Sequence, residues 1–277
     1  MKKIWLLSFI FVGCTHHGQL SLLGDLSQSL NEVSGNEKIG NSDFVWMIND
    51  AGNKPEIFGV NEQGVIKRVI KVTSKNHDWE DLTSDKQGNL YIGDFGNNHL
   101  KRKKLHILKI DNQELLTKKE VAVSKISFEY PKEILGKKDA FDAEAFFLYQ
   151  NNFYIFSKSR EKKHLGKTLL FKVPNSIGKH KAVFLSQFTY ENSADARITA
   201  ADISEDGETV ALLNHKEVFL ITNFQKDQFF KGQMQSISLA HVSQKEGICF
   251  KDGTTLFITD EHSKQSKGNL YAFSFTN

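Results

Sequence analysis

Residues 78–94 read DWEDLTSDKQGNLYIGD. Acidic residues lead into a short apolar run, a polar turn containing Gly88 follows, and a second run rich in aromatic and β-branched residues ends on Asp94. Glycine tolerates the positive φ that tight turns require, so a polar turn with glycine between two such runs is typical of a β-hairpin. The stretch therefore predicts two antiparallel strands with acidic residues at their open end.

The same pattern recurs four more times along the chain. The further copies occupy residues 32–50, 142–158, 201–215 and 246–261. Successive copies are separated by roughly 45 to 64 residues, and further strand-like runs lie between them. Short strands with turn signals at such a period are typical of propellers with four-stranded blades. We therefore predict an all-β fold, a β-propeller of four-stranded antiparallel blades around a central channel.

The number of blades follows from the number of copies, which favours five. The long spacers after Lys109 and after Val173 are either insertions or a degenerate sixth blade, so six blades remain open. We expect the C-terminal strand and the residues before Glu32 to close the ring side by side. A β-sandwich is the alternative fold, but it does not explain why acidic residues recur at one place in the repeat.

The composition excludes several classes of protein. The 22 Phe, 6 Tyr and 3 Trp residues exclude a disordered chain, and the two Cys exclude a disulfide-stapled mini-protein and a Cys-based zinc site. A formal net charge of +3 gives no sign of a nucleic-acid-binding face. The sequence carries no P-loop, G-x-G-x-x-G, G-x-S-x-G or H-E-x-x-H motif. We therefore expect no nucleotide, haem or nucleic acid as a ligand.

The first fourteen residues predict an export signal. Lys2 and Lys3 precede an almost unbroken apolar run, residues 4–12, which is too short to span about 30 Å of bilayer as a helix. The run ends in FVGC, residues 11–14, which resembles the lipobox of bacterial lipoproteins, although Phe11 stands where Leu is usual. The resemblance implies that Cys14 is lipidated and becomes the mature N-terminus. A plain secretory signal is the alternative.

This interpretation divides the chain into three parts. We expect residues 1–13 to be a lipoprotein signal peptide, residues 14–26 to be the lipidated cysteine and a tether, and residues 27–277 to form a single β-propeller domain. The protein is then an exported bacterial lipoprotein of the cell envelope that contacts the membrane through its lipid only. Thr15 follows the cysteine where inner-membrane lipoproteins commonly have Asp, which favours the outer membrane.

Six short stretches carry the acidic and aromatic residues of the repeat, namely residues 46–53, 78–81, 93–97, 142–145, 199–204 and 246–248. Together they resemble bacterial propellers of the "esterase-like phytase" domain family and, more distantly, lactonase-type propellers. The resemblance implies a propeller with a calcium-like ion in its channel. Two residues depart from the pattern, since Ala201 replaces Glu and Lys158 stands where Asp50 and Asp94 stand elsewhere. The sequence also lacks the Lys/Arg-rich phosphate cradle that a phytase needs.

The first strand of each blade lines the channel of a propeller, so equivalent acidic residues converge on one axis. The expected ring consists of glutamates with two aspartates one position along: Glu32, Glu80, Glu144, Glu246, Asp81 and Asp202. Carboxylates gathered in a low dielectric must bind a cation, take up protons or pair with bases. Oxygen ligands favour Ca²⁺, with Mg²⁺ next. The alternative is that each carboxylate accepts backbone N–H groups of the neighbouring blade and staples the ring.

A second polar set marks the ends of the next strands, which would surround one mouth of the channel. Its members are Asn49, Asp50, Asp94, Lys158, Asn214, His215, Asp260 and Glu261. This mixture suits a small polar ligand better than a metal cage, and ordinary solvated loop ends are the alternative. His77 and His215 are candidates for a general base, although a single histidine is more often structural.

Two functions are consistent with these residues. The first is a ligand- or partner-binding module with a structural ion, whose partner is a small polar ligand or an envelope protein. The alternative is a metal-dependent hydrolase of an ester, lactone or phosphoester, in which a base activates water beside the ion. A closed, fully ligated ion would favour the first function, and an ion site open to a wide mouth would favour the second.

Overall fold

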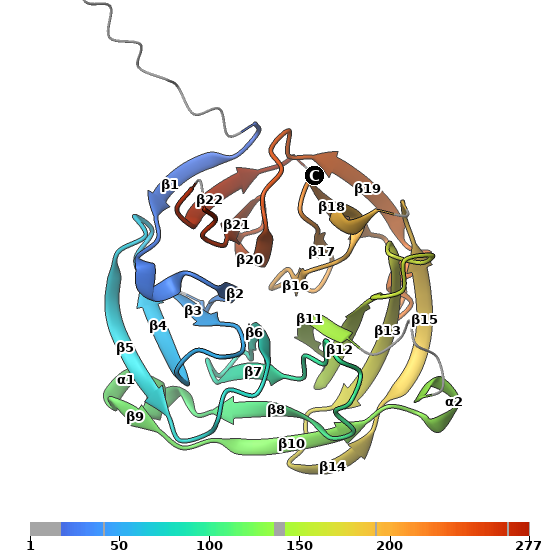
Figure 1. Ribbon diagram of the computed structural model, residues 1–277, viewed down its shortest axis with the longest axis horizontal. Helices are drawn as coiled ribbons and strands as arrows, with labels where there is room; N and C mark the ends of the chain where they lie inside the picture. Colours follow the sequence, from blue (N-terminus) through green and yellow to red (C-terminus); the bar gives the residue numbers. More distant parts are fainter. Residues whose placement is uncertain (1–17, 41, 136–141, 192, 265, 277) are drawn as a thin grey trace, which may run out of the picture.

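Five β-sheets stand around a central channel (Figure 1). The computed structural model describes residues 18–40, 42–135, 142–191, 193–264 and 266–276. The innermost strands of the five sheets contact one another in a closed ring. In chain order they are β2 (Val33–Lys38), β6 (Trp79–Ser84), β11 (Asp142–Tyr149), β16 (Ala200–Ile203) and β20 (Lys245–Asp252). The predicted β-propeller is confirmed, with five blades.

Each blade continues outward from its inner strand through three antiparallel strands. Blade 1 adds β3 (Val45–Asn49), β4 (Glu56–Val60) and β5 (Ile66–Val72), and blade 2 adds β7 (Leu90–Asp94), β8 (Leu105–Ile110) and β10 (Ser124–Glu129). Blade 3 adds β12 (Asn152–Lys158), β13 (Lys167–Pro174) and β15 (Val183–Thr189), and blade 4 adds β17 (Val210–Leu213), β18 (Glu217–Thr222) and β19 (Gln233–Ser238). Strands β3, β7 and β17 are buried at every residue, which explains why they read as continuous apolar runs.

The two long spacers hold insertions and no sixth blade in the part of the chain that the structure describes. After β8 the chain reaches back and adds β9 (Glu120–Val121) parallel to β5 of blade 1. After β13 it adds β14 (Gly178–Lys181) parallel to β10 of blade 2. Each insertion thus ties its own blade to the preceding one. The remaining short elements are α1 (Asn112–Thr117), α2 (Lys132–Leu135) and the 3₁₀ turns η1 (Gln28–Leu30), η2 (Ala194–Ala196) and η3 (Phe229–Lys231).

The N-terminal strand closes the ring, as expected. Blade 5 consists of β20, β21 (Thr255–Asp260), β22 (Asn269–Ser274) and, at its outer edge, β1 (Ser21–Asp25). The propeller therefore begins at Ser21, before the boundary expected at residue 27. The signal peptide and Cys14 lie outside the described residues. No described helix has the length and apolar character needed to cross a membrane.

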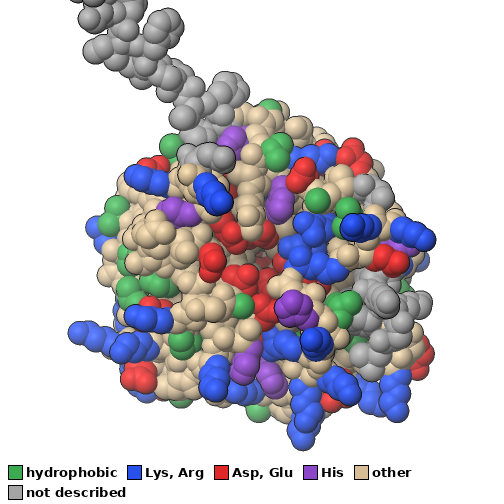
Figure 2. All heavy atoms as spheres, in the orientation of Figure 1, with side chains coloured by type: hydrophobic (Ala, Val, Ile, Leu, Met, Phe, Trp, Pro, Cys, Tyr) green, Lys and Arg blue, Asp and Glu red, His purple; other side chains and the backbone are tan. Residues whose placement is uncertain are grey.

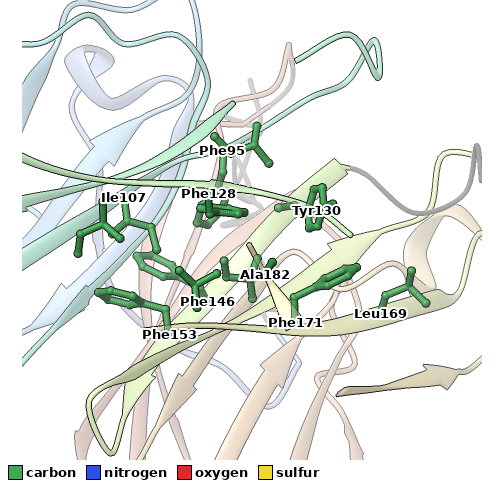
Figure 3. Packing of buried hydrophobic residues seen from close by; sticks show 14 of the residues in the cluster. Phe95, Ile107, Phe128, Tyr130, Phe146, Phe153, Leu169, Phe171 and Ala182 are labelled. Atoms are coloured by element: carbon green, nitrogen blue, oxygen red, sulfur yellow. The ribbon is translucent and has the colours of Figure 1, made fainter. Parts of the chain in front are cut away.

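Aromatic side chains fill the space between blades 2 and 3 (Figure 3). The rings of Phe95 and Phe146 meet edge to face with 5.1 Å between centroids, and those of Tyr91 and Phe153 do the same at 5.1 Å. Such pairs contribute about 0.5–1.5 kcal/mol beyond the apolar area they bury. This packing holds β11 firmly beside β6, and it thereby places the acidic residues of the two inner strands next to each other.

Candidate functional site

A β-bulge interrupts four inner strands at the same place, near their first residues. The residues left out of the pairing are Ser34, Glu80, Glu144 and Glu246. A bulge re-aims the side chain of its extra residue, and here it turns these residues toward one mouth of the channel. The bulge position on blade 1 belongs to Ser34. Glu32, the residue expected there, lies before β2, is exposed, and accepts a hydrogen bond from Asn53 Nδ2 at 2.6 Å.

Three members of the expected channel set and four of the expected mouth set meet in a cavity of about 350 Å³. They meet because each bulge lies at the start of an inner strand, which pairs with the end of the next strand. Asp and Glu side chains gather at this hollow in the centre of the ring (Figure 2). The lining residues are Ser34, Asp50, Glu80, Asn98, Glu144, Lys158, Arg160, Arg197, His215, Gln244, Glu246 and Glu261.

Five carboxyl groups in and beside this cavity form two overlapping groups of three. One consists of Asp50, Asp78 and Glu80, and the other of Glu80, Asp142 and Glu144, with the oxygens of each group within 4.8 Å of one another. Two oxygens bound to one Ca²⁺ at 2.3–2.6 Å are at most about 5 Å apart, so either group has the spacing to share one ion. The donors are all oxygens, which suits a hard cation. These buried acidic residues could therefore hold a metal ion.

Basic side chains pair with two members of the second group, Asp142 and Glu144. Lys158 Nζ donates to Glu144 Oε2 at 2.8 Å, and Arg160 Nη2 donates to Glu144 Oε1 at 3.0 Å. Arg160 Nε also binds Asp142. Burial works against ionisation of Glu144, but Lys158, the hydrogen bond from Asp142 and Arg160 outweigh it and hold the pKa of Glu144 below its usual value. Lys158 and Arg160 thus pair with Glu144, and Arg160 also pairs with Asp142, whose pKa burial and the neighbouring Glu144 nevertheless raise to about 8.

No described basic residue makes an ion pair with the first group, although the charge of Arg102 opposes the rise that burial causes in the pKa of Asp78. Asp50 accepts a bond from the Ala51 N–H, and among the described residues no donor contacts Glu80, although its side chain is buried. Burial raises the pKa of Asp50 to about 7, and the charges of Asp78 and Glu144 act in the same direction. Burial, with the neighbouring carboxylates, raises the pKa of Glu80 well above its usual value. Three carboxyl groups in this state cannot all ionise unless a cation joins them.

Gly96 makes the close approach of these carboxyl groups possible. A Cβ at this position would lie 1.9 Å from Glu80 Oε1 and 2.5 Å from Asp78 Cγ, closer than any side chain tolerates. The sequence analysis did not single out Gly96, although it lies in the stretch 93–97 that carries the family resemblance. A glycine two residues after the acidic end of a strand was the available signal.

Asp81 and Asp202 lie deeper in the channel and play a different part. Asp81 accepts the N–H of Leu82 at 2.8 Å and, through its other oxygen, the N–H of Phe146 on the next blade at 3.1 Å. Asp202 accepts the N–H of its own neighbour at 2.8 Å and that of Phe250 on blade 5 at 2.8 Å. For these two residues the structure shows the stapling that the sequence left as an alternative to metal binding.

Four members of the expected mouth set do not line the cavity. They are Asn49, Asp94, Asn214 and Asp260, and their side chains bind neighbouring loop and strand residues. Asp94 also holds His77, with 3.0 Å between Asp94 Oδ2 and His77 Nδ1. The His77 side chain is 49% exposed and lies outside the cavity lining, so it is not placed to act on a ligand there.

His215 is the candidate base that does line the cavity. Its Nε2 lies 3.3 Å from Glu246 Oε1, and its Nδ1 lies 3.6 Å from Asp195 Oδ1. The side chain is 15% exposed. Two carboxylates thus hold the imidazole from both sides at the edge of the cavity.

Several site residues were missed by the sequence analysis. Asp78 and Asp142 each precede a ring glutamate by two residues, a D-x-E spacing that the two best copies of the repeat share. That spacing was a usable signal, since residues two apart in a strand share a face. Arg160 and Arg197 carried no such signal, because both lie in the connections outside the repeated hairpins.

The comparisons with known proteins bear on the fold. The sequence matches no known protein-family model and no curated protein. A gluconolactonase from Xanthomonas campestris superposes with a TM-score of 0.50 at 9% identity, covering 93% of this chain and 89% of that one. The chain has the fold of that β-propeller. A luciferin-regenerating enzyme gives a TM-score of 0.47 at 15% identity, with coverage of 88% and 78%. Virginiamycin B lyase from Staphylococcus aureus gives 0.45 at 11% identity, with coverage of 88% and 66%.

Proposed function

We propose that this chain is a calcium-dependent binding protein. The ion would sit at Asp50, Asp78 and Glu80, and the adjoining cavity of about 350 Å³ would hold a small polar ligand. One observation carries the proposal: the carboxyl groups of half-buried Asp50 and buried Asp78 and Glu80 face one point at the mouth, and Glu80 meets no donor among the described residues. Ca²⁺ takes six to eight oxygen ligands. Three carboxyl groups leave positions for ligand oxygens on the cavity side.

The two carboxyl groups on blade 3 have another task in this proposal. Because Lys158 and Arg160 pair with Asp142 and Glu144, that wall of the cavity would bind no second ion and would contribute hydrogen-bonding groups. When bound, the ion would draw a ligand oxygen toward blades 1 and 2. The remaining lining residues would then orient the rest of the ligand.

Thermal unfolding of the purified protein tests the ion site. At a Ca²⁺ concentration one hundred times Kd, the native state gains about 2.7 kcal/mol relative to the protein in EDTA. For a chain of this length that corresponds to a rise in Tm of roughly 5–10 °C. Glu80→Gln should abolish the rise, whereas Glu205→Gln, on an exposed turn, should keep it. No rise with Ca²⁺, or an unchanged rise in Glu80→Gln, would contradict the proposal.

A metal-dependent hydrolase of an ester, lactone or phosphoester is the second candidate function. It is favoured by the open side of the carboxylate group, which faces a cavity, and by His215 on the lining of the same cavity. Held between Glu246 and Asp195, His215 could take a proton from water at its edge of the site. Assays with p-nitrophenyl acetate, an aliphatic lactone and p-nitrophenyl phosphate test this function. Turnover that EDTA and His215→Gln both abolish would support it, and no turnover of any substrate would leave the binding function.

We also propose that the protein is an exported lipoprotein, anchored through Cys14 and facing the periplasm from the outer membrane. The leader pattern of residues 1–14 supports export and lipidation, and Thr15, where inner-membrane lipoproteins commonly have Asp, favours the outer membrane. Fractionation of a bacterial host tests it. Wild type should partition with membranes, and Cys14→Ser should not carry lipid by mass spectrometry.

A further inference from the structure

Blade 4 differs from the other blades at the mouth of the channel. Its inner strand pairs without a bulge, from Ala200 opposite Leu213, and it brings no glutamate to the cavity. Ala201 stands where blades 2, 3 and 5 carry a glutamate, and two residues before it Thr199 Oγ1 donates to the Lys245 carbonyl at 2.7 Å. Blade 4 instead brings Arg197, from the turn before β16, and His215, from the end of β17. Where blades 2, 3 and 5 bring a glutamate to the cavity, blade 4 brings an arginine and a histidine.

Arg197 differs from the other cationic residues of the cavity in its partners. Lys158 and Arg160 both bind carboxylates. Arg197 uses its Nε to donate to the Ala194 carbonyl at 2.9 Å, which fixes the direction of the side chain. Its two terminal nitrogens meet no acceptor among the described residues. Arg197 therefore offers the cavity a positive charge that no acidic side chain of the described protein neutralises.

The position of Arg197 in the ring adds to this asymmetry. In a ring of five, blade 4 lies across the channel from the junction of blades 1 and 2 (Figure 1). That junction carries Asp50, Asp78 and Glu80. Lys and Arg side chains accordingly border the acidic centre on the side of blades 3 and 4 (Figure 2). The basic side chains of the cavity lining, Lys158, Arg160 and Arg197, thus come from blades 3 and 4, across from the first carboxyl group of three, although Glu144 lies among them.

We infer that Arg197 binds an anionic group, a carboxylate or a phosphate, on the small molecule that the cavity takes. The free edge of a planar guanidinium presents two parallel N–H groups, which match two oxygens of either anion. The inference rests on the proposed function, in which an ion at Asp50, Asp78 and Glu80 binds the other end of the ligand. That ion would offset the repulsion between these carboxylates and an anionic ligand. The ligand class is a small polar acid whose charged group points toward blade 4. About 350 Å³ is at the small end of ligand cavities, which limits the ligand to a compact molecule.

Calorimetric titration with three matched probes tests this inference. Phenyl phosphate and benzoate carry the two anions, and benzamide is the neutral control. Each is titrated at constant ionic strength, first with Ca²⁺ and then with EDTA. Wild type should bind at least one anion and should not bind benzamide, and the better anion identifies the natural group as phosphate or carboxylate. Arg197→Gln should weaken anion binding at least tenfold. Arg197→Lys should weaken it less, because it keeps the charge and loses only the planar fork.

Lys231→Gln removes one positive charge far from the cavity and should bind the anions as wild type does. Equal Tm values for wild type and the Arg197 variants in EDTA would show that the variants are folded. If Arg197→Gln does not fold, the anion affinity of Arg197→Lys is compared with that of wild type instead. Wild-type affinity in Arg197→Gln, or no binding of either anion, overturns the inference. If Ca²⁺ raises the Tm but neither anion binds, the anion subsite at Arg197 is overturned and the ion site stands. Anion binding that needs Arg197 without any Ca²⁺ response instead overturns the ion site and upholds the anion subsite.

Discussion

Glu80 and Asp81 are neighbours in the sequence, yet they behave as opposites in the structure. Glu80 sits on the bulge of β6, faces the cavity and meets no donor among the described residues. Asp81 sits in the regular part of the same strand and accepts two backbone N–H groups, one of them from Phe146 on the next blade. The difference teaches that the bulge decides whether a carboxylate of this strand faces the cavity or binds the backbone of the next blade.

The largest expected effect comes from the stapling residue. Asp81→Ala leaves the buried N–H of Phe146 without its acceptor, which should lower the free energy of unfolding by about 3 kcal/mol. Chemical denaturation in EDTA measures this loss. The loss should be the same with saturating Ca²⁺, since Asp81 does not face the ion. A loss that Ca²⁺ changes by more than experimental error would place Asp81 in the ion site and erase the contrast with Glu80.

The next effect is a pH dependence of the ion-free protein. Burial is the main cause that raises the folded-state pKa of Asp50 to about 7, of Asp142 to about 8 and of Glu261 to about 9. In the unfolded chain such groups have a pKa of about 4. Between a pH of about 4 and the folded-state pKa values, the folded state therefore binds more protons than the unfolded state. The free energy of unfolding must fall as the pH rises through this range.

We expect the Tm in EDTA to fall by several degrees between pH 6 and pH 9. Ca²⁺ should reduce the fall, because the ion replaces the proton on Asp50. Thermal unfolding across this range is the measurement. A Tm that is flat or rises with pH in EDTA would show that these mouth carboxyl groups are ionised without cost and need no cation.

A smaller effect should follow from filling the space beside Glu80. Gly96→Ala places a methyl group where Glu80 Oε1 and Asp78 now lie, so the carboxyl groups must separate. We expect Ca²⁺ affinity to fall at least tenfold, equivalent to about 1.4 kcal/mol. Calcium titration by calorimetry measures it, with Gly253→Ala as the control because a Cβ there meets nothing within 4 Å. An unchanged Ca²⁺ affinity in Gly96→Ala would show that the ion does not bind beside Glu80 and Asp78.

The smallest effect is the sharpest test of the comparison. In EDTA, Glu80→Gln should be as stable as wild type or more stable by up to about 1 kcal/mol, because it removes a buried acid that no donor satisfies. Chemical denaturation of both proteins in EDTA decides the sign. A clear loss of stability would mean that Glu80 staples the ring as Asp81 does.

The sequence by itself determined the hairpins, the all-β class and the end of each hairpin at which acidic residues collect. These features depend on alternation, turn residues and spacing within about twenty residues, all of which are local. The D-x-E pairs at Asp78 and Asp142 were within reach of the same reasoning.

Only the tertiary structure decided which acids are available. The bulges place Ser34, and not Glu32, beside Glu80, and the donor that occupies Asp81 comes from Phe146, 65 residues away. The insertions that carry β9 and β14 add to the outer edges of preceding blades, and Arg197 reaches the cavity from a connection outside the repeat. Each of these outcomes depends on a contact between blades, and a hydrogen-bond partner or a neighbouring charge from another blade leaves no periodic signal in the strand that it completes.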